Sequence, residues 1–289
     1  MGGAVGVITK TFLCVLLMAA AAPAQKASDW SQVETALGRA GKLDSGIYKV
    51  TFPRTDLHVR IGNTSVEPAA GLTSWMAFRQ DRGGAVVDGD LALLEAEVTP
   101  VVSTLTLNGF EVSAIHNHLM AERPRIMFVH FFARGDLGKL ATALKNTLAQ
   151  TKTPRAPVVS EAKPAYDTKA IETIMGKSGN LNGTVLGFSF PREHRISAHS
   201  VALAPSMGMA TAINFQPAPA GVVATGDFVL REAEVDPVIE ALRAGGISIT
   251  AVHTHLLDAE PRMIFLHFWA EGTPESVAKV LKAALAEAK

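Results

Sequence analysis

The chain has 289 residues, and its 27 lysine and arginine residues balance its 27 aspartate and glutamate residues. These charges are scattered, so the sequence lacks the basic stripe that follows phosphate groups, and we expect no nucleic-acid partner. No glycine-rich phosphate loop and no Gly-x-Ser-x-Gly elbow are present, so no nucleotide cofactor is indicated. The composition is that of an ordinary globular protein.

Residues 1–24 have the pattern of a secretory signal peptide. Lys10 precedes an apolar run over residues 12–22, and the small residues Ala22, Pro23 and Ala24 close it. Such a segment is removed on export, so we expect cleavage near Ala24 and a periplasmic or extracellular protein with no stable membrane anchor. The only cysteine, Cys14, lies inside the run, so the mature chain can form no disulfide.

The remaining sequence is written twice. With an offset of 137, residues 89–133 match residues 226–270 at 21 of 45 positions, and the motif Phe-Pro-Arg ending at Arg54 recurs at Arg192. We expect a first α+β repeat over 25–150, a proline-containing linker over 151–165 and a second α+β repeat over 166–289. Two long copies are typical of a fused dimer, which predicts repeats packed about a pseudo-twofold axis.

Each repeat begins with a short helix and continues as β-rich sequence. Asp29 and Asp167 are candidate N-caps for the first helix, because an aspartate side chain accepts hydrogen bonds from the first free backbone N–H groups. The β-rich sequence is expected to run to about residue 97 or 234. Asp90 and Asp227 each follow a glycine, which favours a role in a turn.

A second helix, a β-hairpin and a final helix complete each repeat. Thr99-Pro100 and Asp236-Pro237 predict the start of the second helix, since proline favours the first helical turn. The hairpin is expected to pair residues 110–119 with 126–133. Asp136 and Thr273 are the predicted caps of the final helix. The predicted fold class is therefore α+β.

Six of the nine histidines lie on these two hairpins. In each copy, two histidines separated by one residue share one face of a strand, and a third on the returning strand can reach them. Three converging imidazoles are typical of catalytic zinc, which keeps one position open for water. The predicted metal ligands are His116, His118 and His130 in the first repeat and His253, His255 and His267 in the second.

Polar residues near the hairpins are candidates for the remaining chemistry. Glu97 and Glu234 are expected to act as general base or as acceptors that orient the histidines, and Glu95 and Glu232 accompany them. Glu122 and Glu260 are weaker candidates, because they fall one position out of register between the copies.

Arginines that follow proline in both copies could steady an anionic group. Arg125 and Arg262 are expected to hold an oxyanion by paired hydrogen bonds. The alternative is a structural ion pair with Asp90, Glu95 or their equivalents in the second repeat, and this alternative also applies to Arg54 and Arg192.

Three functional hypotheses follow. The first is a divalent-metal site in each repeat, most simply zinc, with hydrolysis at a metal-bound water. The second is a non-catalytic envelope module that binds a small molecule or a cell-wall fragment. The third is structural, with the histidines packed between the two halves.

The ordered set of motifs resembles the LppY/LpqO family, a domain of unknown function in exported bacterial proteins. The resemblance rests on Phe-Pro-Arg, Gly-Asp, Glu-x-Glu-Val-x-Pro, the His-x-His segment, Pro-Arg and His-Phe, each present in both halves. It implies an exported protein with the domain in duplicate. It implies no substrate, and no catalytic residues can be transferred from it. The family's lipoproteins carry a cysteine after the apolar run, which this chain lacks.

Overall fold

The computed structural model describes residues 1–3, 29–157 and 160–288. From residue 4 onward, the expected signal peptide and its cleavage point near Ala24 lie outside the described residues. Within the described residues, no helix combines the length and the apolar character that crossing a membrane requires.

Each repeat contains one six-stranded antiparallel sheet, three α-helices and a short β-ribbon. The elements of the first repeat are α1 (Ser31–Leu37), β1 (Lys42–Asp44), β2 (Ile47–Pro53), β3 (Arg60–Ile61), β4 (Thr64–Ser65), η1 (Pro68–Ala70), β5 (Thr73–Asp81), β6 (Gly84–Leu94), α2 (Glu95–Leu107), β7 (Glu111–His116), β8 (Ile126–Gly135) and α3 (Leu137–Leu148). Those of the second are α4 (Thr168–Met175), β9 (Asn180–Asn182), β10 (Val185–Pro191), β11 (Ile196–Ala198), β12 (Val201–Leu203), η2 (Pro205–Met207), β13 (Ala210–Ala218), β14 (Gly221–Leu230), α5 (Glu232–Ala244), β15 (Ser248–His253), β16 (Ile264–Gly272) and α6 (Pro274–Glu287).

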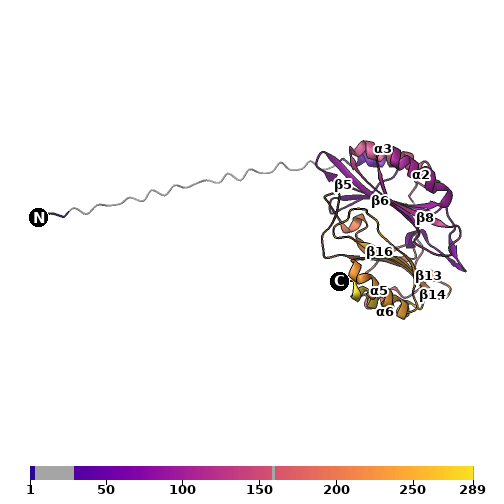
Figure 1. The fold of residues 1–289 in the computed structure, drawn as a ribbon. Helices are drawn as coiled ribbons and strands as arrows, with labels where there is room; N and C mark the ends of the chain where they lie inside the picture. Colours follow the sequence, from indigo (N-terminus) through magenta and orange to yellow (C-terminus); the bar gives the residue numbers. More distant parts are fainter. Residues whose placement is uncertain (4–28, 158–159, 289) are drawn as a thin grey trace.

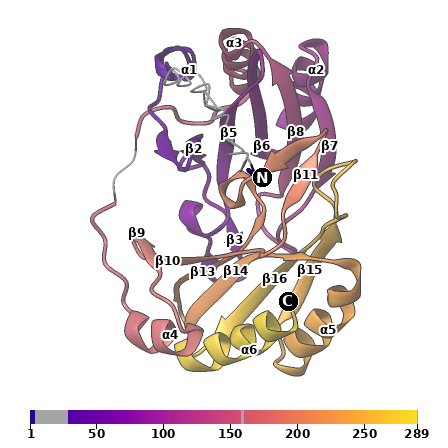
Figure 2. The same ribbon diagram turned by 90° about the vertical axis from the view of Figure 1, so that its left-hand side faces the viewer.

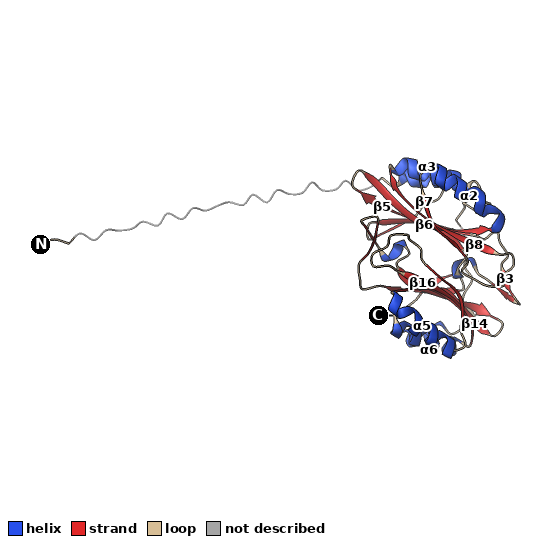
Figure 3. Ribbon diagram, in the orientation of Figure 1, coloured by secondary structure: helices blue, strands red, loops and turns tan. Residues whose placement is uncertain are grey.

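The two sheets have the same strand order. The first runs β1-β2-β5-β6-β8-β7, and the second, read in the same direction, runs β9-β10-β13-β14-β16-β15. The sheets face each other, with the helices of each repeat on the outer faces (Figures 1 and 3). The view from the side shows the same helix–sheet–sheet–helix layering (Figure 2). The α+β fold and the pairing of two similar units are therefore confirmed.

Separate hydrophobic cores hold these layers together. One core lies between the first sheet and its helices, and includes Leu37, Phe78 and Leu144. The corresponding core of the second repeat includes Phe215 and Leu281. Two further clusters lie between the sheets. Burial of these apolar side chains is the main favourable term in folding.

The helix caps follow the sequence in most places. Asp167 accepts a hydrogen bond from Ala170, Asp136 from Lys139 and Thr273 from Ser276, as predicted. In the first helix, Trp30 occupies the N-cap position, although the Asp29 carboxylate accepts a hydrogen bond from the Ser31 N–H.

The second helix starts earlier than predicted in both repeats. It begins at Glu95 and Glu232, with Pro100 and Pro237 inside the helix. The glutamate at the third helical position explains the difference, because the Glu97 side chain accepts a hydrogen bond from the Leu94 N–H and so caps the helix there. Two pairs expected in extended sequence, Glu95 with Glu97 and Glu232 with Glu234, therefore lie in helical first turns.

The hairpin is shorter than predicted at its first strand. β7 ends at His116 and β15 ends at His253, so His118 and His255 lie in the connecting turns rather than on strands. The prediction that each His-x-His pair alternates along one strand was wrong for its second member.

Candidate functional site

The described structure brings all six hairpin histidines into one cluster between the sheets. Rings of the first repeat stack on rings of the second: the centroids of His116 and His253 are 3.6 Å apart, and those of His118 and His267 are 3.9 Å apart. His130 and His255 form the third such pair, at 3.7 Å. We expected one trio in each repeat, but the cluster is shared by both.

The groups of mutually close ligand atoms also cross between the repeats. Four sets of side chains have ligand atoms within 4.8 Å of one another: His116 with His130 and His255; His116 with His253 and His267; Asp90 with His118 and His130; Asp227 with His255 and His267. The last two sets match under the repeat alignment, and each combines two imidazoles with one carboxylate.

Strand register places the two aspartates beside histidines. Asp90 lies opposite His130 in the β6–β8 ladder, and Asp227 lies opposite His267 in the β14–β16 ladder. Opposed residues project to the same face of a sheet. The interpretation of these aspartates as turn residues was therefore wrong, because each lies within a long strand. Each aspartate precedes the third histidine of its repeat by the same number of residues, and this spacing was a sequence signal that could have linked the two.

Hydrogen bonds determine which nitrogen of three histidines carries the proton. Nδ1 lies 3.2 Å from the Asn117 carbonyl oxygen in His116, 3.2 Å from that of Thr254 in His253, and 3.1 Å from that of Gly226 in His267. A carbonyl oxygen only accepts, so each Nδ1 must donate. In the neutral ring, Nε2 then carries a free lone pair.

Two such lone pairs face each other at short range. The Nε2 atoms of His253 and His267 are 3.0 Å apart, yet two unprotonated nitrogens cannot form a hydrogen bond. Burial lowers the pKa of His253 to about 4 and that of His267 well below its usual value. Burial therefore favours the neutral form of both rings near pH 7, and with each Nδ1 donating to a carbonyl oxygen, neither Nε2 carries a proton.

Other polar atoms of the cluster have no hydrogen-bond partner although they are buried. Among the described residues these include Oδ1 of Asp90 and the Nε2 atoms of four histidines, His116, His118, His130 and His255. Asp90 Oδ2 lies 3.6 Å from Nε2 of both His118 and His130, which is too long for a hydrogen bond. A buried unpaired polar group costs about 1–3 kcal/mol, so packing alone does not explain this arrangement.

Burial shifts the titration of the whole region. It lowers the pKa of His116 to about 3, with the neighbouring His253 adding to the effect, and it lowers the pKa values of His118, His130 and His255 well below the usual range.

The aspartates of the same region shift in the opposite direction. Burial raises the pKa of Asp227 to about 7 and that of Asp88 to about 8. It also raises the pKa of Asp90 well above its usual value, with the charges of Asp227 and Asp88 contributing. Lys49, whose pKa burial lowers to about 8, lies near all three. Neutral imidazole nitrogens and clustered carboxyl groups both offer lone pairs, so together they favour the binding of a cation.

The expected catalytic glutamates and arginines are not brought to the histidines. Glu97 Oε2 lies 2.8 Å from Nη1 of the buried Arg54, and Glu234 Oε1 lies 2.8 Å from Nη2 of Arg192. These arginine–glutamate pairs join the Phe-Pro-Arg strand end to the second helix. Arg54 and Arg192 thus form structural ion pairs, as the alternative predicted, but with Glu97 and Glu234 instead of the expected Asp90, Glu95 or their equivalents.

The two other arginines and the weaker glutamate candidates also lie outside the cluster. Arg125 and Arg262 are exposed beside the turn of their hairpins. Glu122 is buried and its Oε1 accepts a hydrogen bond from the Ile126 N–H, whereas Glu260 is exposed. None of these residues belongs to the four groups of close ligand atoms.

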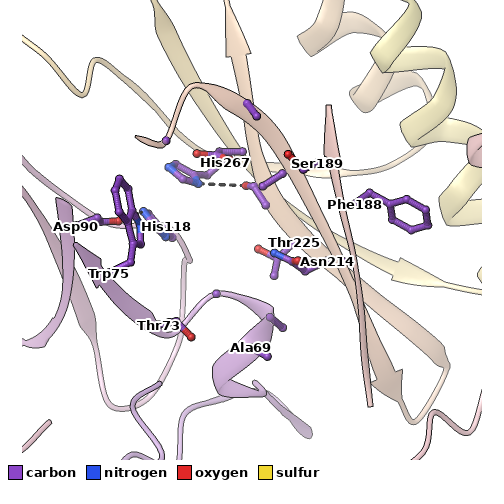
Figure 4. Close-up of a pocket in the computed structure, with 18 of the residues that line it drawn as sticks. Ala69, Thr73, Trp75, Asp90, His118, Phe188, Ser189, Asn214, Thr225 and His267 are labelled. Carbon is purple, nitrogen blue, oxygen red and sulfur yellow. Dashed lines mark hydrogen bonds and ion pairs between the residues drawn. The ribbon is translucent and has the colours of Figure 1, made fainter. Parts of the chain in front are cut away.

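A cavity of about 460 Å³ adjoins the cluster (Figure 4). Its wall includes both aspartates and four of the histidines, and extends over β10, β13 and β14 to η1 and β5. Lys49 and Trp75 also line it. Sequence reasoning assigned neither of them to a site, because neither belongs to a repeated motif.

Comparisons with known proteins add the family. A search of curated proteins gives no match. A crystal structure of a trimeric bacterial microcompartment shell protein, PduB, is similar at 11% identity over 86% of this chain and 90% of that chain, with a TM-score of 0.23. A likeness this weak carries no argument. Residues 31–150 and 169–287 each match one family, and the chain therefore belongs to the family described as a Domain of Unknown Function (DUF1259), which it contains in two copies.

Proposed function

We propose that this protein binds a divalent transition metal, zinc first among them, in the histidine cluster between its two repeats. The ligands come from the six histidines together with Asp90 and Asp227. Imidazole nitrogen suits zinc, copper, iron and nickel, and one carboxylate beside two imidazoles is a common donor set for such ions.

The facing Nε2 atoms of His253 and His267 carry this proposal. Ligands held 2.0–2.1 Å from a zinc ion are about 3.0 Å apart at a right angle and about 3.4 Å apart at the tetrahedral angle. The 3.0 Å separation of these nitrogens agrees with two ligands of one ion. Their Nδ1–H groups already donate to backbone carbonyls, which is how metal-binding histidines are usually oriented.

Hydrolysis is the reaction we assign to this centre. A bound zinc ion lowers the pKa of its water ligand to about 7 and so supplies a nucleophile at neutral pH. In this proposal, whichever of Asp90 and Asp227 does not bind the metal accepts the proton of that water, since the glutamates predicted for this role are bonded to arginines.

Metal analysis of protein purified without a histidine tag tests the proposal. We expect at least one equivalent of bound metal after dialysis, and its loss in the variant His253→Ala plus His267→Ala. The matched control replaces two exposed histidines outside the cluster, His58→Ala plus His194→Ala, and should keep the metal. Visible absorption of the Co²⁺-loaded protein adds a readout, because a tetrahedral Co²⁺ site gives much stronger bands than octahedral aqueous Co²⁺.

Two outcomes contradict the proposal. One is a folded wild-type protein that takes up no zinc, cobalt, copper, nickel or iron. The other is metal content that is unchanged when both histidines are replaced. A metal-free, folded protein whose thermal stability rises with an organic ligand would instead favour the binding-module hypothesis.

We infer further that the chain is an exported protein of the LppY/LpqO type. Support comes from Lys10, the apolar run over 12–22 and the small residues up to Ala24. N-terminal sequencing of protein recovered from the periplasm or medium is expected to begin near Gln25. Recovery of the full-length chain from the cytoplasm alone would contradict export.

A further inference from the structure

The cavity beside the histidines belongs to one half of the interface only. Its floor is the inner face of the second sheet, on β10, β13 and β14, and η1 of the first repeat covers it. In Figure 4, Thr225 and Asn214 lie across the cavity from Trp75 and Ala69. The corresponding covering element of the second repeat, η2, lies against β2 of the first sheet.

Substitutions between the repeats explain why this half is open. Ala77 and Asn214 are equivalent positions under the repeat alignment. Lys49 pairs with Ala77 in the first sheet and Gly187 pairs with Asn214 in the second, so glycine takes the place of lysine. In the same way, Ala212 takes the place of Trp75. Two large side chains of the first sheet are thus replaced by the two smallest.

The two large side chains fill their own half. Nζ of Lys49 lies 4.0 Å from the centroid of the Trp75 ring and donates a hydrogen bond of 2.9 Å to the Ser206 carbonyl oxygen. The Trp75 ring packs against Gly208, where an added Cβ would lie 3.1 Å from it. The second sheet has no large side chains at the positions equivalent to Lys49 and Trp75. Its cavity of about 460 Å³ lies in the range of roughly 300–1,000 Å³ typical of small-molecule sites.

The wall of the open half is polar but mostly uncharged. Away from the histidines it presents the hydroxyl or amide groups of Thr73, Ser189, Asn214 and Thr225. The ammonium group of Lys49 donates to the Ser206 carbonyl oxygen and lies near Asp88, Asp90 and Asp227, which offset its charge, and the other charged residues of the wall are the two aspartates. An anionic ligand would meet carboxylates without a free arginine, whereas hydroxyl groups find both donors and acceptors.

We propose that this open half binds a small, neutral, polyhydroxylated molecule of about monosaccharide size, with Trp75 as a stacking surface at one side. This inference rests on the proposed metal centre, because one oxygen of the ligand is to face the Asp227, His255 and His267 group. On the first sheet, a cavity of about 400 Å³ lies beside Lys49 and Ser206, but its wall contains no histidine or aspartate of the cluster. Within the described residues, the open half is therefore the one that places a ligand at the proposed metal centre.

Saturation-transfer NMR on the zinc-loaded full chain tests this inference. The probes are D-glucose, D-galactose and D-xylose, with D-gluconate as an anionic comparison. Ala212→Trp introduces the tryptophan of the first sheet and should raise the dissociation constant of the sugars, obtained by titrating the transfer signal, about tenfold, which equals about 1.4 kcal/mol of binding free energy. The matched control Ala220→Trp adds an indole at an exposed turn and should leave transfer unchanged.

Asn214→Ala provides a second variant that keeps the cavity open, and it should weaken sugar binding without loss of metal. Three results would each overturn the pocket proposal alone. The first is metal uptake without transfer to any sugar, and the second is sugar binding by Ala212→Trp that equals that of the wild type. The third is stronger binding of gluconate than of glucose. Sugar binding by a chain that takes up no metal would overturn the proposed function and leave the pocket assigned.

Discussion

The two halves of the interface differ although they descend from one pattern. On the first sheet, β11, β12 and the chain up to Met209 pack apolar side chains against Ile47, Val86 and Phe132. On the second sheet, the covering segment meets the buried amide of Gln216, which donates to the Ser65 carbonyl oxygen and accepts from the Glu67 N–H.

This difference shows which features the repeats share and which they do not. The strand ladders and the metal-ligand candidates occupy equivalent positions in both repeats. Side-chain volume on the inner faces varies freely, because a cavity in one sheet does not disturb its hydrogen-bonded ladder. A symmetric scaffold can therefore present symmetric ligands and yet give access from one side.

The largest expected effect compares the two buried arginines. Arg54 is fully buried and bonded to Asp56 and Glu97, so Arg54→Ala should cost about 3–5 kcal/mol in unfolding free energy by leaving a buried charge unpaired. Arg192→Ala should cost less, because Arg231 also pairs with Glu234. Urea denaturation measures both, and equal losses would contradict this difference between the repeats.

Removal of the Trp75 side chain, which fills the first half of the interface, has the next largest expected effect. Trp75→Ala should destabilise the chain by about 3 kcal/mol, the low end for loss of a large aromatic side chain, because one face of the ring already lines the cavity. Thermal or urea unfolding provides the measurement. A loss below about 1 kcal/mol would mean that the ring does not fill this half as described.

Metal removal should have a smaller effect that involves both halves. If zinc joins ligands from the two repeats, a zinc concentration one hundred times the dissociation constant adds about 2.7 kcal/mol of stability. Calorimetry with zinc and with EDTA should therefore give a higher melting temperature with zinc. The variant that lacks His253 and His267 serves as the control and should melt at the same temperature in both.

The smallest expected effect concerns a contact at the edge of the interface. His199 Nε2 lies 3.2 Å from Oε1 of Glu111 in the first repeat, and His199 Nδ1 lies 3.2 Å from Oδ2 of Asp258 in the second. All three side chains are partly exposed, so His199→Gln should change the unfolding free energy by about 1 kcal/mol or less. A change of several kcal/mol would show that this contact, rather than the packed sheets, holds the halves together.

Much of the fold was predictable because its signals are local. Capping by Asp136, Asp167 and Thr273 depends on residues within one turn. The start of the second helix was misplaced because Glu97 competes with Pro100 as a start signal, and the glutamate prevails through its bond to the Leu94 N–H. His118 was placed on a strand because alternation does not reveal where a ladder ends.

The sequence by itself determined the duplication, the α+β class and the six histidines as the place where chemistry concentrates, because repetition and short-range spacing are properties of the chain. Only the tertiary structure decided that the histidines of the two repeats stack on one another, that Asp90 and Asp227 join them, and that one half is open. The stacking depends on contacts between residues more than one hundred positions apart, such as His116 with His253, and the position of the aspartates depends on the strand pairs Asp90–His130 and Asp227–His267. No local pattern encodes which side chains of two facing sheets will meet.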